Sequence, residues 1–167
     1  IEGHGKLVAA NTVEVNGEKY IGKNIILATG SYPKTLPGLE IDGTVIITSE
    51  QAINLDRVPK SVIVLGGGVI GCEFASVWKS FGAEVTIIEG LPHLVALEDE
   101  SSSKQLERAF RKRGINFELG IKFKSATKSK TGVEVTLEDG KTFTAEVLLV
   151  AVGRGPVSTN IGYEEQG

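Results

Sequence analysis

The stretch VIVLGGGVIGCEFASVWKSFG, residues 62–82, continues as AEVTIIE, residues 83–89, and these residues decide the fold. An apolar, β-branched run leads into a cluster of glycines, and the residues after the cluster repeat their apolar positions at helical spacing. A second β-branched run, Glu84–Glu89, ends on an acidic side chain. The order predicted is strand, tight turn, helix and parallel strand, which is the order of a dinucleotide-binding βαβ unit.

The glycines of this stretch have the GxGxxG spacing, at Gly66, Gly68 and Gly71. Alone, the pattern is a weak signal in a chain with 21 glycines. Its place between a strand and a helix strengthens it, because each glycine then has a physical task. Gly66 permits the tight turn, Gly68 has no Cβ to obstruct a diphosphate, and Gly71 lets the helix lie close to the sheet. The alternative is a glycine-rich turn that only packs a helix on a strand.

Glu89 ends the second strand, 23 positions after Gly66. A carboxylate there can accept hydrogen bonds from both hydroxyls of an adenosine ribose, and it repels a 2′-phosphate. The next four residues, Gly90–His93, include no Arg or Lys that would attract such a phosphate. NAD is therefore favoured over NADP, with a solvated glutamate at a strand end as the alternative.

Two other side chains of the predicted helix allow two interpretations each. Glu73 could approach the nicotinamide end of the cofactor, but an acidic residue in a first helical turn is also stabilised by the helix dipole. Cys72 lies on the same turn, where a thiol pKa can be lowered, yet a single cysteine among apolar neighbours is more typical of a small core residue. His4 and His93 have no evident nucleophile or metal partner in the sequence, and we interpret both as structural or exposed.

The composition bounds the class of protein. The 167 residues include 18 Lys and Arg against 21 Asp and Glu, with both signs scattered. The pattern favours neither nucleic acid nor anionic lipid as a partner. The longest apolar run, Val147–Val152, is far shorter than the ~20 residues of a membrane span. We expect a soluble protein with no membrane partner. The absence of Met suggests a piece of a longer chain.

The remaining segments extend the pattern on both sides. Asn16-Gly17 is typical of a hairpin turn, here between strands at Gly5–Val15 and Glu18–Ile21. Further along, the sequence predicts the following: a buried strand at Asn24–Gly30, a short helix at Ser49–Leu55, a helix at Ser103–Arg113 with Leu106 and Phe110 inward, strands at Ile115–Leu119, Lys122–Lys128 and Val133–Leu137, and one long strand at Thr142–Val152. The predicted class is α/β, a Rossmann-like FAD/NAD(P)-binding fold with a βαβαβ parallel core and an antiparallel three-stranded meander.

A spacing recurs within the chain. Gly17 to Gly30 and Gly140 to Gly153 are both 13 positions apart, and each second glycine lies three before a proline. A strand ending in Ala-x-Gly can bring its backbone close to a ligand. The repeat suggests pieces of two nucleotide-binding domains, with coincidence between two ordinary hairpins as the alternative.

The chain shows no pair of cysteines, no nucleophile beside a base and no set of metal ligands. We therefore predict no catalytic residue and no metal site in it.

Four segments together resemble a known family: IILATGSYP (25–33), VIVLGGGVIGCEFAS (62–76), FGAEVTIIE (81–89) and VLLVAVGRGP (147–156). They resemble the pyridine nucleotide-disulfide oxidoreductases, and within that family the dihydrolipoamide dehydrogenases. In this family an NAD domain is inserted into an FAD domain. The resemblance implies three parts: residues 1–38 from the FAD domain, residues 39–150 as the NAD domain, and residues 151–167 returning to the FAD domain.

The resemblance also implies roles for individual residues. The segment beside FAD corresponds to Thr29, Gly30 and Ser31, with Gly5 near the FAD adenosine. The NAD site corresponds to the phosphate loop and its neighbours: Gly66, Gly67, Gly68, Val69, Ile70, Gly71 and Glu73, with Glu89 at the ribose, Phe123 at the adenine and Gly153 beside the nicotinamide half.

The family's redox cysteines and first FAD motif would precede residue 1, and its dimerisation domain with a His-Glu base would follow Gly167. We therefore expect the chain to bind NAD(H) without retaining FAD and to be inactive alone. Its parent is expected to be a homodimer associated with 2-oxoacid dehydrogenase complexes, cytoplasmic or, in a eukaryote, in the mitochondrial matrix. The alternatives are a piece of another FAD/NAD-dependent disulfide, peroxide or quinone reductase, and a free-standing NAD-binding regulatory module.

Overall fold

The computed structural model describes residues 1–167, which divide into two compact units. The larger unit is Pro33–Gly153, and the smaller unit combines Ile1–Tyr32 with Arg154–Gly167. The division into FAD and NAD domains at residues 38/39 and 150/151 stays a prediction. Each unit is described by itself below.

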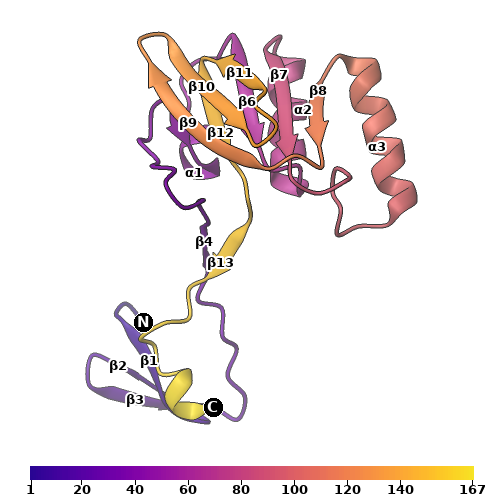
Figure 1. Cartoon of the computed structure of the whole chain (residues 1–167). Coiled ribbons are helices and arrows are strands. Elements are labelled where there is room, and N and C mark those ends of the chain that lie inside the picture. Colours follow the sequence, from indigo (N-terminus) through magenta and orange to yellow (C-terminus); the bar gives the residue numbers. More distant parts are fainter. The chain divides into compact units, whose positions relative to one another are not determined.

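The larger unit is built on a five-stranded sheet with the strand order β5-β12-β6-β7-β8 (Figure 1). All neighbouring strands in it are parallel. The strands are β5 (Ile46–Ile47), β6 (Ser61–Leu65), β7 (Glu84–Glu89), β8 (Asn116–Leu119) and β12 (Val147–Val150). The predicted βαβαβ core is confirmed, because β6, β7 and β8 follow one another through two helices and pair side by side.

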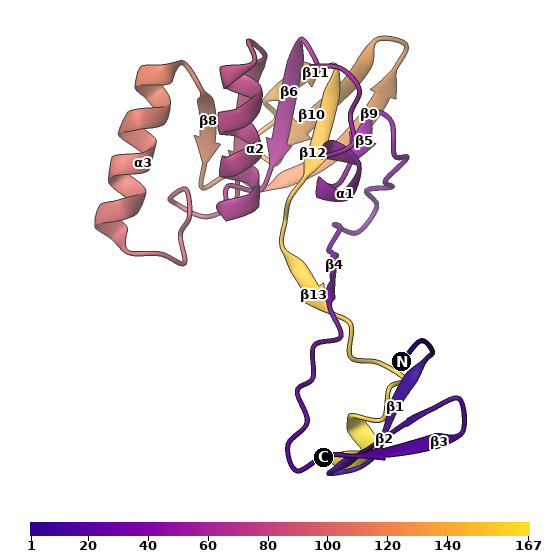
Figure 2. The same cartoon turned by 180° about the vertical axis from the view of Figure 1, so that it is seen from behind.

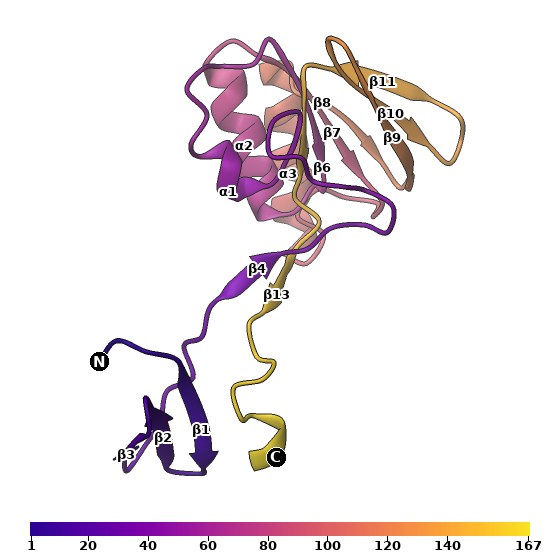
Figure 3. The same ribbon diagram turned by 90° about the vertical axis from the view of Figure 1, so that its left-hand side faces the viewer.

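Three helices cover one face of this sheet, as the view from behind shows (Figure 2). They are α1 (Ser49–Ala52), α2 (Val69–Ser80) and α3 (Glu100–Arg113). The other face carries the antiparallel meander of β9 (Phe123–Ser129), β10 (Gly132–Leu137) and β11 (Thr142–Ala145), so that Figure 3 shows helices and meander on opposite sides. The predicted meander is confirmed.

The sheet is buried on both faces, which explains its continuous apolar runs. Neighbouring residues of one strand belong to different cores: Val64 packs with the helices, whereas Ile63 and Leu65 pack with the meander. Eleven residues of the sheet are at most 1 % exposed, and a side chain so buried contributes about 1.5–3 kcal/mol. The two cores together hold the strands whose ends form the site described below.

The ends of the long helices follow local chemistry. Asp99 caps α3 by accepting a hydrogen bond from the Ser101 N–H, and Gly114 ends it in the left-handed conformation. In α2 the buried residues are Gly71, Cys72, Ala75 and Trp78. Phe81 continues the apolar spacing of this helix in the sequence, but it follows the last helical turn and is 67 % exposed.

The smaller unit contains a three-stranded antiparallel sheet of β1 (Gly5–Ala9), β2 (Thr12–Val15) and β3 (Glu18–Ile21). The predicted turn at Asn16-Gly17 is present, with positive φ at both residues. The single strand predicted at Gly5–Val15 is wrong, because a second turn at residues 10–11 divides it into β1 and β2. The other elements are β4 (Ser31–Pro33), which begins in this unit, β13 (Arg154–Pro156) and a short 3₁₀ helix, η1 (Glu164–Gln166).

The buried strand predicted at Asn24–Gly30 is also wrong. These residues form no strand, and Ile26 is 90 % exposed. An apolar segment becomes a buried strand only where neighbouring strands accept its backbone hydrogen bonds, and none pairs with this segment.

The long strand predicted at Thr142–Val152 is two strands in different sheets, β11 and β12. Glu146 lies at the break, where its N–H donates to Ser61 Oγ and its carboxylate accepts from the Lys60 N–H. These bonds redirect the chain from the meander into the parallel sheet. None of the helices in the structure is both long and apolar enough to cross a membrane.

Candidate functional site

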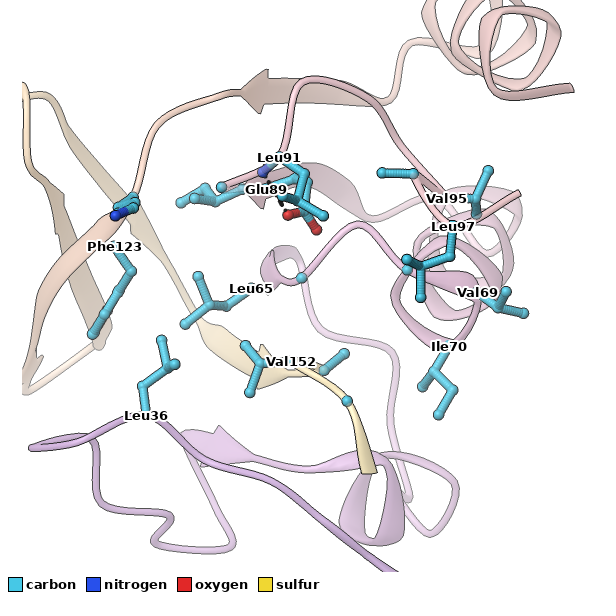
Figure 4. A pocket seen from close by; sticks show the side chains of 18 of the residues that line it. Leu36, Leu65, Val69, Ile70, Glu89, Leu91, Val95, Leu97, Phe123 and Val152 are labelled. Atoms are coloured by element: carbon cyan, nitrogen blue, oxygen red, sulfur yellow. Dashed lines mark hydrogen bonds between the residues drawn. The ribbon is translucent and has the colours of Figure 1, made fainter. Parts of the chain in front are cut away.

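A pocket of about 600 Å³ lies in the larger unit, at the carboxyl ends of its parallel strands (Figure 4). The ends of β6, β7 and β12 contribute Leu65, Ile88, Glu89 and the segment Ala151–Gly153. The volume lies within the range of about 300–1,000 Å³ that is typical of small-molecule sites. Ligands of open α/β sheets bind at this edge, so the fold itself points to this pocket.

The glycine turn forms one wall of the pocket, and two of its glycines are required by close packing. Gly66 has φ +110°, and a Cβ there would lie 2.3 Å from the Ala151 carbonyl oxygen. A Cβ on Gly71 would lie 2.0 Å from the Gly66 carbonyl oxygen. Contacts this short with backbone cannot be relieved by a side-chain movement, so larger residues are excluded at both positions.

Gly68 is different, because a Cβ built on it meets no atom within 4 Å. Gly68 lines the pocket and has an ordinary negative φ of −72°. Neither packing nor backbone conformation inside the chain requires a glycine here. Gly68 is exposed beside the pocket, and the βαβ binding mode brings a diphosphate close to the backbone at this position.

The amino end of α2 begins at Gly68, whose lack of a side chain leaves the first turn without a side-chain cap. The first N–H groups of a helix have no intrahelical partner and carry a partial positive charge. Val69 and Ile70 of this turn also line the pocket, and Figure 4 shows them on the side opposite Phe123. The arrangement suits an anion beside Gly68.

Glu89 faces the same pocket from the end of β7. Its Oε2 accepts a hydrogen bond from the Gly67 N–H at 2.6 Å, and its Oε1 accepts from the Leu91 N–H at 2.8 Å. Both bonds fix the carboxylate in place beside the glycine turn. Each oxygen keeps a second acceptor position for a ligand hydroxyl.

Most of the residues expected at an NAD site line this pocket: Gly66, Gly68, Val69, Ile70, Glu89, Phe123 and Gly153. Two others do not line the pocket but pack against residues that do or that lie beside them. Gly67 packs beneath Leu94 and the Glu89 stem, and Gly71 packs beneath the Gly66 carbonyl.

Glu73 is placed apart from these residues. It is exposed and lines a second, apolar groove, which lies over α2 between α1 and α3 and is shared with side chains such as Phe74 and Val77. The larger unit by itself therefore gives Glu73 no contact with the pocket that Glu89 lines.

Cys72 is buried below the turn, and its thiol donates to the Gly67 carbonyl oxygen at 3.3 Å. Burial, together with the nearby carboxylates of Glu89 and Glu73, raises the pKa of the Cys72 thiol to about 11. A thiol with this pKa stays protonated near neutral pH and is a poor nucleophile. The core interpretation of Cys72 fits these surroundings.

The structure adds pocket residues that sequence reasoning missed: Leu36, Leu91, Val95, Ala96, Leu97, Glu98 and Lys122. They come from loops, which carry no periodic pattern. The sequence contains no signal for Leu97 either, because it only ends the short apolar run Leu94–Leu97, and its 95 % exposure is seen in the structure alone. Lys122 matters most, since it brings a cation into the pocket from a segment far from Glu89 in the sequence.

The residues expected beside FAD lie in the smaller unit. Gly5 is in β1, and the carbonyl oxygen of Gly30 accepts a hydrogen bond from the Val157 N–H. Thr29 Oγ1 donates to the Val157 carbonyl oxygen at 2.5 Å, and Arg154 donates to Ser31 through its side chain. The structure thus brings Thr29, Gly30 and Ser31 together with the returning segment.

Comparison with known proteins gives consistent matches along the chain. The family model described as pyridine nucleotide-disulphide oxidoreductase matches residues 1–167. A dihydrolipoamide dehydrogenase from Chaetomium thermophilum is 42 % identical over all of this chain and 35 % of its own length, and a dihydrolipoyl dehydrogenase from Cupriavidus necator is 39 % identical over all of this chain and 37 % of its own length.

The crystal structure of LpdA from Mycobacterium tuberculosis superposes with a TM-score of 0.85 at 30 % identity, covering all of this chain and 39 % of that one. The chain spans a little more than a third of the length of the curated relatives named above. Together with the α/β fold and the glycine turn, these matches show that the chain belongs to the pyridine nucleotide-disulfide oxidoreductase family.

Proposed function

We propose that the pocket of the larger unit binds NAD(H), with the diphosphate against the glycine turn and the adenosine ribose at Glu89. The observation that carries the proposal is the open space at Gly68. Gly66 and Gly71 are explained by packing within the chain, whereas Gly68 has no internal reason to lack a side chain. A ligand that approaches the backbone closely supplies that reason.

The preference for NAD over NADP rests on Glu89, whose carboxylate would accept from the ribose hydroxyls and repel a 2′-phosphate. Lys122 lines the same pocket and carries the opposite charge. Glu89 is fixed by two backbone N–H groups close to the glycine turn, whereas Lys122 comes from the loop before β9. We therefore assign the ribose to Glu89 and expect Lys122 to reduce the discrimination without reversing it.

The other end of the cofactor would lie toward Gly153, at the carboxyl end of β12. Phe123 would lie against the adenine, since its ring enters the pocket from the side opposite α2. Glu73 is kept as a candidate for the nicotinamide end, although its carboxylate lies on the other groove of the larger unit.

For the whole protein we propose a dihydrolipoamide dehydrogenase, which oxidises protein-bound dihydrolipoamide and passes the electrons through a disulfide and FAD to NAD. NAD would be the final electron acceptor of this transfer. This chain would contribute the NAD site and, through Gly5, Thr29, Gly30 and Ser31, part of an FAD site. We propose that the chain alone is inactive and retains no FAD, and that its parent is a homodimer associated with 2-oxoacid dehydrogenase complexes.

There are two alternative hypotheses for the function. The first is the same kind of piece from another disulfide, peroxide or quinone reductase that uses FAD and NAD. The second is a free-standing NAD-binding module with a regulatory role. The smaller unit argues against the module, because an NAD-binding unit does not need Ile1–Tyr32 to form its own sheet.

A fluorescence titration with NADH and NADPH tests the proposal. We expect the wild-type chain to bind NADH more tightly than NADPH, and Gly68→Ala to weaken NADH binding by about tenfold or more, about 1.4 kcal/mol. The melting temperature of Gly68→Ala should stay close to that of the wild type, because its Cβ meets no protein atom.

Val77→Ala is the matched control. This residue is exposed on the same helix, away from the pocket.

Glu89→Gln should lower the preference for NADH over NADPH. An absorbance scan tests for flavin. Unchanged NADH binding by Gly68→Ala, or a wild-type preference for NADPH, contradicts the proposal.

A further inference from the structure

Glu107 is a buried carboxylate on α3, and it belongs to no site described above. Only 8 % of its side chain is exposed. Its Oε1 accepts a hydrogen bond from the Leu94 N–H at 3.2 Å and lies 3.1 Å from His93 Nδ1. Arg111, one helical turn further on, is the third neighbour at 3.6 Å. Two of the three contacts of Glu107 are therefore to one loop, residues 93–95.

Ser103 lies one helical turn before Glu107 and holds the same loop. Its hydroxyl donates to the Val95 carbonyl oxygen at 3.3 Å, and the residue is 1 % exposed. Val95 has φ +44°, a conformation that is costly for a β-branched residue. Such a residue persists only where its surroundings fix it. The bonds from Ser103 and Glu107 supply that constraint on both sides of Val95.

The loop in turn holds the glycine turn. The Val95 N–H donates to the Gly67 carbonyl oxygen at 2.7 Å, the same oxygen that accepts from the Cys72 thiol. The side chain of Leu94 is fully buried and packs so closely over Gly67 that a Cβ there would lie 2.7 Å from Leu94 Cδ2. The loop thus contacts the turn at the peptide that joins Gly67 to Gly68.

The direction of that peptide decides where the Gly68 N–H points. A trans peptide directs its C=O and its N–H to opposite sides. With the Gly67 carbonyl fixed toward Val95 and Cys72, the Gly68 N–H is fixed on the side away from them. If this peptide rotated, the turn would present a carbonyl oxygen where an N–H is needed, and a phosphate would be repelled.

We infer that Glu107 is a positioning residue for dinucleotide binding: through Leu94 and Val95 it fixes the Gly67–Gly68 peptide in the orientation that suits the diphosphate. The inference rests on the proposed NAD function. A buried carboxylate is expensive, and an apolar residue would fill the same place at lower cost. A carboxylate is explained by the N–H of Leu94 and the ring of His93, both in the loop that lines the pocket at Val95.

The test compares Glu107→Leu, which removes both acceptor oxygens, with Glu107→Gln, which keeps one amide oxygen for the Leu94 N–H. We expect Glu107→Leu to weaken NADH binding by about tenfold and Glu107→Gln by about threefold or less. In the absence of NADH, amide hydrogen exchange at Leu94 and Val95 should become faster in Glu107→Leu, while β6 and β7 stay protected. Gln105→Ala, at an exposed position of the same helix, is the control.

Ser103→Ala provides a second route if Glu107→Leu does not fold. It removes the bond to the Val95 carbonyl oxygen and should weaken NADH binding by about threefold with the same local increase in exchange. Wild-type NADH affinity in both Glu107→Leu and Ser103→Ala overturns the inference and leaves the proposed function intact. Weaker binding that appears only with loss of protection throughout β6 and β7 also overturns it. Absence of NADH binding by the wild-type chain overturns the proposed function, and the inference with it.

Discussion

Two segments of this chain share a sequence pattern and differ in structure. Asn24–Gly30 and Val147–Gly153 are both apolar runs that end in Ala-x-Gly, each with its last glycine 13 positions after a turn glycine. In the second segment Leu148 and Leu149 are fully buried within β12. In the first segment Ile26 and Leu27 are 90 % and 53 % exposed, and no strand forms.

The difference lies in the neighbours. β12 is flanked by β5 and β6, with Leu149 opposite both Ile47 and Val64. The helices and the meander then cover its two faces. Asn24–Gly30 has no strand beside it in the chain. A buried parallel strand is thus specified by what surrounds it as much as by its own residues, and the following predictions test that statement for β12.

The largest effect is expected where β12 ends against the glycine turn. Gly66→Ala places a Cβ 2.3 Å from the Ala151 carbonyl oxygen at a positive φ, whereas Gly30→Ala at φ +85° meets no atom within 4 Å. We expect Gly66→Ala to lower the free energy of unfolding by more than about 4 kcal/mol. Gly30→Ala should lower it by about 1–2 kcal/mol, because of backbone strain alone. Urea unfolding followed by circular dichroism measures both.

If Gly66→Ala and Gly30→Ala lower the free energy of unfolding by equal amounts, the contrast between the two segments is wrong. They would mean that the end of the first segment is packed as closely as the end of β12. The fluorescence of Trp78, the only tryptophan and a core residue of the larger unit, provides a separate signal for Gly66→Ala.

The next effect concerns one leucine from each segment. Leu149→Ala removes a fully buried side chain and should cost about 2–5 kcal/mol, while Leu27→Ala, at a half-exposed position, should change the free energy of unfolding by about 0.5 kcal/mol or less. Urea midpoints at a constant m-value would show the difference. A loss above about 2 kcal/mol for Leu27→Ala would show that the first segment is buried after all.

The two segments also show how far sequence reasoning reached. The strands β6 and β7, the helix α2 and the meander were predictable, because an apolar period and turn glycines specify them locally. The error at Asn24–Gly30 came from reading the same apolar signal where neighbours are absent. The division of Thr142–Val152 was missed because it depends on Glu146 and its partners Lys60 and Ser61, which lie about 85 positions away.

The candidate site shows the same division between local and distant information. Gly66, Gly68, Gly71 and Glu89 were predictable from one continuous stretch of 24 residues. Lys122 and Leu36 were not, because loops bring them to the pocket without a repeating pattern. The contacts of Glu107 with residues 93–95 were hidden for a related reason. A glutamate in a basic helix is typical of an exposed face, and only the structure reveals the loop that covers Glu107.

The smallest effect concerns the strand that flanks β12 on its outer side. β5 has only two residues, and Asp42 holds the turn before it by accepting hydrogen bonds from the Thr44, Val45 and Ile46 N–H groups. Lys128 of the meander forms an ion pair with the same carboxylate at 2.6 Å. Burial alone would raise the pKa of Asp42, but Lys128 and the three N–H groups outweigh it and hold the pKa well below its usual range.

A folded-state pKa below the unfolded value means that the ionised carboxylate stabilises the fold at neutral pH, and that this contribution is lost as the pH falls. Asp42→Asn should therefore cost about 1–2 kcal/mol at pH 7. The gap to the wild type should narrow as the pH drops below about 4, near the pKa of an unfolded Asp. Urea unfolding at a series of pH values measures it, with the exposed Asp56→Asn as control. If the difference in the free energy of unfolding stays constant down to pH ~2, the charge of Asp42 does not stabilise β5. Packing and neutral hydrogen bonds would then be enough to hold β5 beside β12.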